Sequence, residues 1–235
     1  MDMTSVSIST SRLALRTWTP ADLPLALSLW GNKEVTKYVT AGGCYSEAQI
    51  TARFEGEMAM QGEHGVSYWP FFLLANTDAN ANTDVDADVD AQDAGAEGGS
   101  ASVSVSATAT AIVSQSFVGV CGLRPLVGHP PDCLELGIHS LPLHWGQGIG
   151  REMASAVLDW AFTCHGTCTS VFAGHHPDNV ASEAFLLSLG FVAAPPRLYV
   201  PTGLMHNSYW VRKSQYEEAR RSPIESGVSA KDKAR

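Results

Sequence analysis

The chain has 235 residues, 45% of them hydrophobic, and a formal net charge of −9. This length holds one domain with a full core, and the absence of any run of about 18 apolar residues excludes a membrane-spanning helix. Residues 76–116 hold six aspartates and one glutamate but no lysine or arginine, so the remainder has 17 acidic against 15 basic residues and does not indicate nucleic-acid binding.

The first elements predicted are a strand and a helix. Residues 11–18 alternate apolar and polar side chains, which is typical of a half-buried strand. Thr19 before Pro20 indicates a helix start, with threonine as the cap and proline in the first turn. The helix is expected over residues 23–30, and a short helical turn over residues 34–39 follows.

A second helix and a second strand come next. Ser46 with Gln49 forms a capping pair for a helix over residues 47–61. Residues 66–74 have the composition of a strand, although Pro70 favours an edge position or a bulge, because proline cannot donate to a sheet.

The composition changes abruptly at residue 76. From there to about residue 113 the chain is mainly Ala, Asp, Asn, Ser, Thr, Val and Gly, without aromatic residues. Such a segment cannot bury enough apolar surface to become ordered, so we predict a disordered hairpin insertion. The alternating aspartates of residues 84–90 invite a calcium interpretation, but Val89 and Gly95 stand where a loop of the EF-hand type requires glycine and glutamate. We interpret the segment as a solvated acidic loop.

The remaining sequence alternates strands with helices and predicts a mixed α/β layer with one core. An amphipathic helix is expected to run through Phe162, and a helix over residues 177–189 is closed by Gly190. Residues 212–235 form a polar tail that is expected to fray. Strands are predicted over residues 117–123, 133–140, 169–173 and 205–211, with a further strand beginning at residue 191.

The chain start and the cysteines indicate a reducing compartment. Residues 1–4 are acidic and lack the basic and apolar stretches of an export leader. Five cysteines are an odd number without a framework spacing, so we expect buried apolar side chains rather than disulfide partners. We therefore expect a cytoplasmic protein with no membrane partner. Cys164, His165, Cys168, His175 and His176 lie close together, but they lack a zinc-finger spacing, and no metal is expected.

A glycine-rich stretch over residues 145–150 joins a predicted strand to the amphipathic helix. Three glycines at alternate positions leave backbone N–H groups uncovered, and the helix start adds partial positive charge. Together these features predict a phosphate or pyrophosphate site, although an ordinary glycine turn is the alternative. Arg151 stands where the dinucleotide fingerprint needs its third glycine, and the chain has no Gly-Lys pair for a P-loop.

Four segments of the chain match a known pattern in order and spacing: Arg12–Arg16 with Asp22, Phe117–Leu123, Glu135–Glu152, and Asn179–Ser182 closing on Leu189–Phe191. They resemble the GNAT N-acetyltransferase superfamily, and in particular its ribosomal-protein-alanine acetyltransferase branch (RimJ/RimL type). The resemblance runs from about residue 11 to residue 212. It implies an α/β fold of the α+β type, with one mixed, mostly antiparallel sheet flanked by helices. The domain would cover residues 11–213, with the insertion at residues 76–113, an N-terminal extension of residues 1–10 and a tail of residues 214–235.

The resemblance implies acetyl-CoA as co-substrate. Backbone N–H groups at the helix start would bind the pyrophosphate, and the exposed strand edge over residues 136–140 would pair with the pantetheine arm. Asn179 would bind the same arm from the opposite wall. The implied coenzyme-binding residues are Ile138, His139, Ser140, Gly146, Gln147, Gly148, Ile149, Gly150, Arg151 and Asn179.

Two residues are candidates for catalysis. Many family members carry a tyrosine as general acid seven residues after the asparagine, but Leu186 occupies that position here. Ser182 is therefore our candidate proton donor, with a local cap or a coenzyme contact as the alternative. Glu135 is our candidate base, with a solvent-facing strand acid as the alternative.

We therefore expect an acetyl-CoA-dependent N-acetyltransferase that acts on a primary amine, with a protein or peptide N-terminus as the favoured acceptor. A small-molecule amine is the runner-up. A non-catalytic coenzyme A-binding module is a third hypothesis, which the missing tyrosine favours. Loops around residues 31–46 and 195–208 are expected to select the acceptor. Trp69, Phe71, Phe72, Trp160 and Phe162 are expected in the core.

Overall fold

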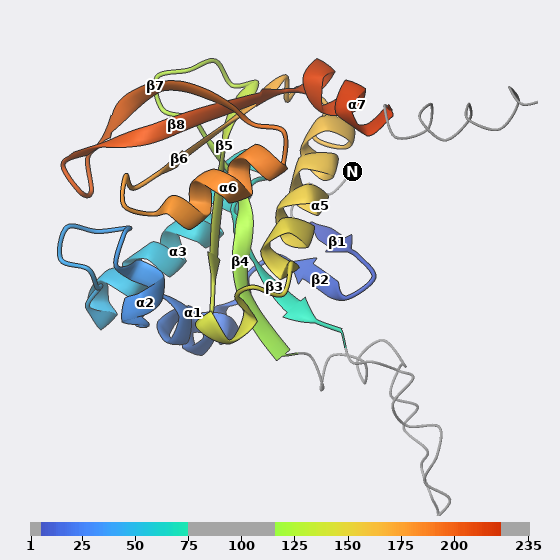
Figure 1. Ribbon diagram of the computed structural model, residues 1–235. Helices are drawn as coiled ribbons and strands as arrows, with labels where there is room; N and C mark the ends of the chain where they lie inside the picture. Colours follow the sequence, from blue (N-terminus) through green and yellow to red (C-terminus); the bar gives the residue numbers. More distant parts are fainter. Residues whose placement is uncertain (1–5, 75–115, 222–235) are drawn as a thin grey trace, which may run out of the picture.

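A computed structural model describes residues 6–74 and 116–221 of the protein. Its strands are β1 (Ser7–Ser9), β2 (Leu13–Arg16), β3 (Tyr68–Leu73), β4 (Ser116–Pro125), β5 (Cys133–Ser140), β6 (Ser170–His175), β7 (Val192–Tyr199) and β8 (Leu204–Arg212). They form one sheet in the order β1-β2-β3-β4-β5-β6-β8-β7 (Figure 1). Every pair of neighbours is antiparallel except β5 and β6, which are parallel. The predicted mixed, mostly antiparallel sheet is confirmed.

The helices are α1 (Leu23–Trp30), α2 (Lys33–Thr36), α3 (Glu47–His64), α5 (Ile149–Thr163), α6 (Val180–Ser188) and α7 (Lys213–Arg221), with 3-10 turns η1 (Pro20–Asp22) and η3 (Pro142–His144). They flank the sheet on both sides (Figure 1). Among the helices of the described residues, none has the length and apolar character needed to cross a membrane.

Local sequence signals set several of these boundaries. Before α1, the backbone N–H of Thr19 donates to Asp22 Oδ2 at 2.8 Å, in a capping box that places proline in the first turn. At the start of α3, Ser46 Oγ accepts a hydrogen bond from the backbone N–H of Gln49. Gly65 ends that helix in a left-handed conformation that only glycine adopts without strain. The predicted cap of α3 is confirmed, whereas Thr19 caps the 3-10 turn η1 and Asp22 is the N-cap residue of α1 itself.

The core is divided by the sheet. On one face, Val157 of α5 and Leu186 of α6 pack in the larger hydrophobic cluster. On the other face, Trp30 of α1 and Phe54 of α3 pack with Val120 of the sheet. We call these sides the α5–α6 face and the α1–α3 face. The two clusters hold the helices in fixed positions on either side of the central strands.

Aromatic side chains behave largely as predicted. Trp69 and Phe71 are fully buried, and Phe72 and Phe162 are nearly so. Trp160 is partly buried and packs against the hydrophobic cluster of the α5–α6 face. The indole of Trp69 also donates to Gln61 Oε1 at 2.6 Å, which satisfies its N–H inside the core.

Pro70 lies in β3, which has β2 on one side of the sheet and β4 on the other. The ladder with β2 covers only Phe71 to Leu73, however, so Pro70 itself is paired on the β4 side alone, where a missing N–H costs no second ladder bond. The ladder with β4 shifts register between Phe71 and Phe72, next to the proline, which confirms the predicted irregularity.

The two ends of the described chain differ from the sequence-based expectations. Residues 7–9 pair with β2 as an additional edge strand. The sequence predicts a tail that frays from residue 212, but residues 213–221 form the helix α7. This helix packs on α5, where Tyr216 is buried and its ring centre lies 5.3 Å from that of Phe162. The acidic insertion lies outside the described residues, apart from its flanks.

The cysteines are all free thiols. Cys121 and Cys168 are buried, as expected, and Cys133 is half-buried. Cys44 and Cys164 are exposed, so the expectation of buried positions is wrong for these two.

Candidate functional site

The two parallel strands at the centre of the sheet separate along their length. β5 pairs with β6 only from Cys133 to Glu135, whereas its pairing with β4 continues to Ser140. β6 in turn stays paired with β8 as far as His175. Figure 1 shows β5 and β6 diverging from their shared end. The second half of β5 is therefore an inner strand with one unpaired edge.

Backbone geometry identifies which peptide groups line that edge. At both ends of β5 the odd-numbered residues bond to the β4 side: Leu141 N–H donates to Val118 C=O at 2.9 Å, and Cys133 C=O accepts from Leu126 N–H at 3.3 Å. Peptide groups alternate direction along a strand. The N–H and C=O groups of the even-numbered residues 136, 138 and 140 therefore point toward the gap between β5 and β6.

The glycine-rich turn leads directly into α5. Gly146 and Gly148 both have φ of +72°, a left-handed conformation that favours glycine. Gly148 is the N-cap residue of α5, and its C=O accepts the first helical hydrogen bond, from the N–H of Glu152 at 3.1 Å. The N–H groups of residues 149–151 therefore have no partner within the helix. They are uncovered backbone donors at the positive end of a 15-residue helix, which is the geometry that an anion site requires.

Three elements converge at this turn. A Cβ atom at Gly150 would lie 3.5 Å from Ile138 Cδ1 and 3.8 Å from Phe185 Cε2. Gly150 thus brings the start of α5 against both β5 and α6. Ser182 lies one helical turn before Phe185, so it faces the same side of α6.

The predicted α6 residues have distinct surroundings. Asn179 is the N-cap residue of α6, but its side chain does not cap the helix. Ser182 is half-buried, and its hydroxyl has no hydrogen bond to any residue that the structure describes. Leu186 is buried in the core, so the position of the family's tyrosine is filled by a hydrophobic side chain.

Two of the predicted coenzyme-binding residues have side chains engaged elsewhere. His139 points to the α1–α3 face, where Trp30 Nε1 donates to its Nδ1 at 3.0 Å. Burial, followed by the charges of Arg53 and Arg124, lowers the pKa of His139 to about 3, so its ring is neutral at pH 7. Ser140 accepts hydrogen bonds from Trp145 Nε1 at its C=O (2.9 Å) and its Oγ (3.1 Å).

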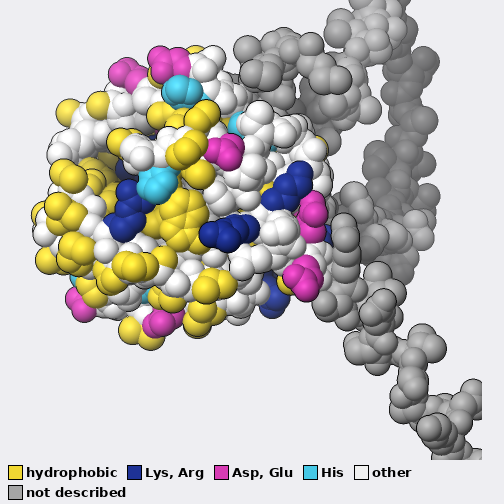
Figure 2. Space-filling model, turned by 90° about the horizontal axis from the view of Figure 1, so that it is seen from above, with side chains coloured by type: hydrophobic (Ala, Val, Ile, Leu, Met, Phe, Trp, Pro, Cys, Tyr) yellow, Lys and Arg dark blue, Asp and Glu magenta, His cyan; other side chains and the backbone are white. Residues whose placement is uncertain are grey.

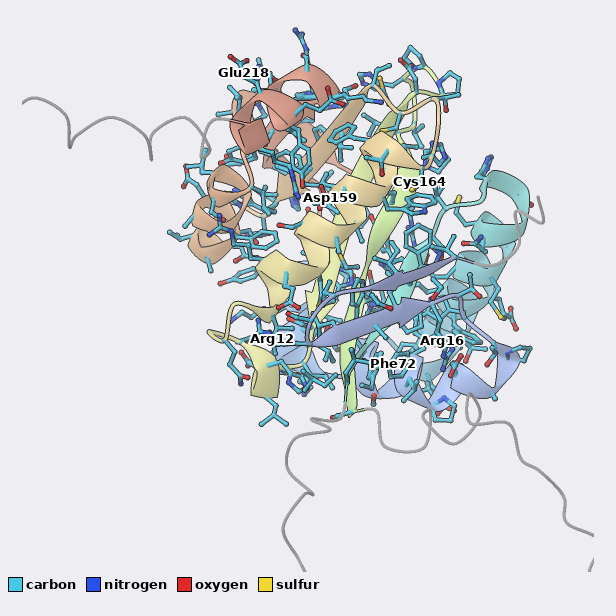
Figure 3. All side chains as sticks on the ribbon, turned by 90° about the vertical axis from the view of Figure 1, so that its right-hand side faces the viewer. Arg12, Arg16, Phe72, Asp159, Cys164 and Glu218 are labelled. Carbon is cyan, nitrogen blue, oxygen red and sulfur yellow. The ribbon has the colours of Figure 1, made fainter. Side chains whose placement is uncertain are left out.

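The turn is also tied to the N-terminal hairpin. Arg12 forms an ion pair with Glu152 at 2.6 Å and donates to Gln147 C=O at 3.4 Å. Thr10 Oγ1 donates to the same carboxylate. Burial opposes ionisation of Glu152, but the hydrogen bonds from Thr10 and Arg12 outweigh it and lower the pKa of this carboxyl. Arg12 lies beside the first turn of α5 in Figure 3.

Glu135 lies at the point where β5 and β6 begin to separate. It is paired with Arg124 across the β4–β5 ladder and with Phe172 in the β5–β6 ladder. Burial raises the pKa of its carboxyl, while the charges of Arg124 and Arg197 act in the opposite direction. A carboxylate with a raised pKa is better suited to accept a proton near neutral pH.

Sequence reasoning missed the charged residues around Glu135. Glu57, on α3, is fully buried and forms an ion pair with Arg124. Its Oε2 also accepts from Ser67 Oγ at 2.8 Å and from the backbone N–H of Tyr68 at 3.0 Å. The signal in the sequence is an arginine at the end of the apolar run that forms β4, where a buried partner is required.

The two loops expected to select the acceptor meet in space. Ala41 N–H donates to Pro201 C=O at 3.1 Å, which joins the loop after α2 to the β7–β8 turn. Tyr38 stacks on His176 with ring centres 5.0 Å apart. His176 in turn lies edge-on to His206, 5.5 Å away. Aromatic side chains therefore line the contact between these loops.

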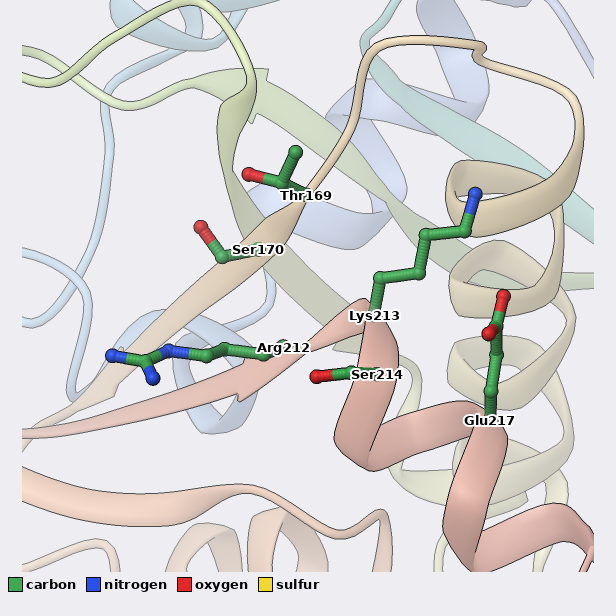
Figure 4. A pocket seen from close by; sticks show the side chains of 6 residues that line it. All are labelled: Thr169, Ser170, Arg212, Lys213, Ser214 and Glu217. Atoms are coloured by element: carbon green, nitrogen blue, oxygen red, sulfur yellow. The ribbon is translucent and has the colours of Figure 1, made fainter.

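Two surface pockets lie away from the β5–β6 opening. One is lined by Arg212, Lys213 and residues near the start of β6, where that strand is still paired with β5 (Figure 4). The other lies along the outer side of α5 near Asp159 and Cys164 (Figure 3). Seen from above, hydrophobic, basic and acidic side chains are interspersed on one face (Figure 2). Among the described residues, no group of three His, Cys, Asp or Glu residues could hold a metal ion.

Solved acetyltransferases share the fold of this chain. The acetyltransferase from Agrobacterium tumefaciens strain C58 is 19% identical, with a TM-score of 0.60, covering 88% of this chain and 94% of that one. Spermidine N-acetyltransferase from Vibrio cholerae, in complex with CoA and spermine, is 15% identical, with a TM-score of 0.58 and coverage of 88% and 99%. RimL, the ribosomal L7/L12 alpha-N-protein acetyltransferase in complex with coenzyme A, is 14% identical, with a TM-score of 0.60 and coverage of 88% and 98%.

The chain belongs to the GNAT acetyltransferase family. A family model described as an acetyltransferase (GNAT) domain matches residues 12–192, which is more than half of the chain. The protein is therefore an N-acetyltransferase, of a family that uses acetyl-CoA. Comparison with curated proteins gave no significant match.

Proposed function

We propose that the protein transfers the acetyl group of acetyl-CoA to the α-amine of a protein or peptide N-terminus. The observation that carries this proposal is the unpaired edge of β5 beside the uncovered N–H groups of α5. Residues 136–140 offer backbone groups to an amide-rich chain, and residues 149–151 offer backbone donors to a diphosphate. This arrangement fits the two chemically distinct parts of coenzyme A.

Glu135 is the proposed base. At pH 7, deprotonating a lysine side chain with a pKa of about 10.4 costs roughly 4–5 kcal/mol, whereas an α-amine with a pKa of about 7.7–8.0 costs only about 1 kcal/mol. A single carboxylate acting directly or through one water therefore suffices for an α-amine. The raised pKa of Glu135 and its place beside the gap support this role.

The remaining steps are orientation and proton delivery. Acetyl-CoA supplies the acetyl group as a thioester, so the amine nitrogen bonds to the carbonyl carbon, the carbon–sulfur bond breaks, and the thiolate requires a proton. A β5 N–H facing the gap would polarise the carbonyl. Ser182 is the proposed proton donor to the thiolate. Asn179 would bind the pantetheine arm from the α6 side.

A small-molecule amine remains the second candidate acceptor. The similarity to spermidine N-acetyltransferase favours it, although that similarity extends to the fold alone. Because Leu186 replaces the family's tyrosine, the proton for the leaving thiolate has to come from another group, which is the role proposed for Ser182.

The test is thiol release from acetyl-CoA with a panel of N-terminal peptides, lysine-blocked controls and polyamines. We expect turnover with peptides that carry a free α-amine and none with the same peptides after N-terminal blocking. Calorimetry with CoA provides an independent readout of binding. Turnover with polyamines but not with peptides that carry a free α-amine would contradict the proposed acceptor and support the small-molecule amine.

A further inference from the structure

Two arginine side chains flank Glu135 on the α1–α3 face. Arg124 lies directly across from Glu135 in the β4–β5 ladder. On the other side, the Arg197 guanidinium lies 5.1 Å from the centre of the Phe172 ring, and Phe172 is paired with Glu135. The proposed base therefore lies between positive charges from β4 and β7.

A third arginine approaches from α3. The Arg53 guanidinium lies 4.7 Å from the ring centre of Trp30 and 5.8 Å from that of Tyr45. Its charge also acts on His139, which is on the same face of β5 as Glu135 and four residues further along the strand. Arg53 therefore lies on the side where β5 has separated from β6.

The three arginines differ in how their charge is compensated. Arg124 forms an ion pair with the buried Glu57. Arg53 and Arg197 form no ion pair with any residue in the described part of the chain. Arg53 Nε and Arg197 Nη1, like Arg124 Nε, are moreover buried atoms without a hydrogen-bond partner there, so the difference from Arg124 lies in the missing ion pair. Protein structures seldom leave such donors unpaired, because an unsatisfied buried donor costs free energy.

We propose that Arg53 and Arg197 bind a carboxylate of the acceptor, so that the enzyme prefers amines with an acidic group near the reacting nitrogen. A guanidinium presents planar, paired donors that match the two oxygens of a carboxylate. The inference rests on the proposed transfer to an amine and specifies its substrate class. For a peptide, the carboxylate belongs to an aspartate or glutamate close to the N-terminus; for a free amino acid, it is the α-carboxylate.

The same charges disfavour a polyamine acceptor. A polyamine places further positive charges near Arg53 and Arg197, and like charges at close range repel. Glu135, the acid on which the charge of Arg197 acts, has to accept a proton and so does not offset further positive charge. Positive charge around the reacting amine also favours its neutral, nucleophilic form.

A purely structural role for the arginines predicts a different result. Both guanidinium groups lie over aromatic rings, which stabilises a fold through cation–π attraction. Loss of that attraction would lower activity toward all acceptors in parallel. Recognition of a carboxylate instead changes the ratio between acidic and neutral acceptors.

The experiment measures kcat/KM for three peptides that differ only at the second residue, which is aspartate, asparagine or lysine. We expect the aspartate peptide to exceed the asparagine peptide by about tenfold or more, with the lysine peptide lowest. Arg53→Gln and Arg197→Gln should each reduce the aspartate-to-asparagine ratio to within about threefold, and Arg53→Lys should retain part of it. Free asparagine, which has only an α-carboxylate, and a dipeptide amide with aspartate as its second residue, which has only a side-chain carboxylate, distinguish the two sources.

Arg212→Gln is the matched control, since it removes one arginine charge from an exposed site at the end of β8 (Figure 4). It should leave the ratio unchanged. Calorimetry of the same peptides with the CoA-bound protein gives a readout that needs no turnover. Equal affinity for aspartate and asparagine peptides, or a parallel loss for both in the arginine variants, would overturn the inference. Selective binding without acetyl transfer would overturn the proposed function and leave the inference standing.

Discussion

The carboxyl of Glu135 is partly shielded from solvent, and its pKa is raised by that burial, as the proposed role of a base requires. We expect Glu135→Gln to lower kcat about 100-fold, the lower end of the range for general-base catalysis, with little change in CoA affinity. Glutamine keeps the size and hydrogen-bonding capacity of the side chain but cannot take the proton. Stopped-time thiol-release kinetics and calorimetry with CoA measure the two quantities separately. Unchanged turnover would remove Glu135 from the mechanism.

The raised pKa of Glu135 also predicts a pH dependence. A base is active only when deprotonated, and burial raises the pKa of this carboxyl above its ordinary value. Activity should therefore fall as the pH drops through that raised pKa, at a higher pH than for an exposed glutamate. Protonation of the acceptor amine lowers kcat/KM at acid pH in both proteins, so the profile of the wild type should have a further acidic limb that the profile of Glu135→Gln lacks. A limb that persists in the variant belongs to another group.

Ser182 supplies a second test of the chemistry, because its hydroxyl has no hydrogen bond to a described residue. If it protonates the leaving thiolate, Ser182→Ala should lower kcat by at least tenfold while KM for acetyl-CoA changes less than threefold. A mere coenzyme contact would give the reverse pattern. Initial rates over a matrix of acetyl-CoA and peptide concentrations separate the two.

The backbone conformation of the turn before α5 requires glycine at position 148 but not at position 150. Gly148 has φ of +72°, and a side chain there costs about 1–2 kcal/mol, whereas Gly150 is helical and its added Cβ would meet Ile138 at an ordinary 3.5 Å. We expect Gly148→Ala to weaken CoA binding about tenfold. Gly150→Ala should fold at least as well as the wild type, since alanine is the better helix former. Calorimetry compares both variants, and equal affinities would contradict the role of the turn geometry.

Elements governed by local sequence were predictable, and those governed by distant partners were not. The cap formed by Ser46 and Gln49 involves residues three positions apart, so the start of α3 could be predicted. β1 exists because residues 7–9 pair with β2, and a strand of three residues has no periodic pattern of its own. Glu135 and the glycine-rich turn before α5 could be singled out from motifs. The approach of Arg53, Arg124 and Arg197 could not be predicted, because it joins α3, β4 and β7 through the folded sheet.

The C-terminal helix ties the end of the described chain to the centre of the fold. Tyr216 is buried, and its hydroxyl donates to Asp159 Oδ1 at 3.2 Å on α5 (Figure 3). We expect Tyr216→Ala to destabilise the protein by about 3 kcal/mol, as for other large aromatic truncations. That corresponds to a Tm lower by roughly 6–12 °C for a chain of this size. Differential scanning calorimetry measures it, and a change below 2 °C would mean that α7 contributes little.

The acidic insertion lies between two neighbouring antiparallel strands of the sheet, β3 and β4. β3 and β4 are antiparallel neighbours, and Leu73 pairs with Ser116 at the two ends of the insertion. Their backbones are therefore adjacent without help from the residues between them, and a short turn can close the hairpin. Phe72 and Phe117, with ring centres 5.8 Å apart, fix the register just inside that junction.

We expect replacement of residues 75–115 by a four-residue turn to leave the fold, CoA binding and acetyl transfer intact. The sequence predicts no ordered structure for this segment, and closing a flexible loop about ten times longer costs roughly 2 kcal/mol more in chain entropy. The shortened protein should therefore unfold at an equal or higher temperature than the full chain. Because the deletion removes seven acidic residues, both forms should be compared at several salt concentrations. A lower Tm or a loss of turnover at all salt concentrations would mean that the acidic segment packs on the domain or takes part in acceptor binding.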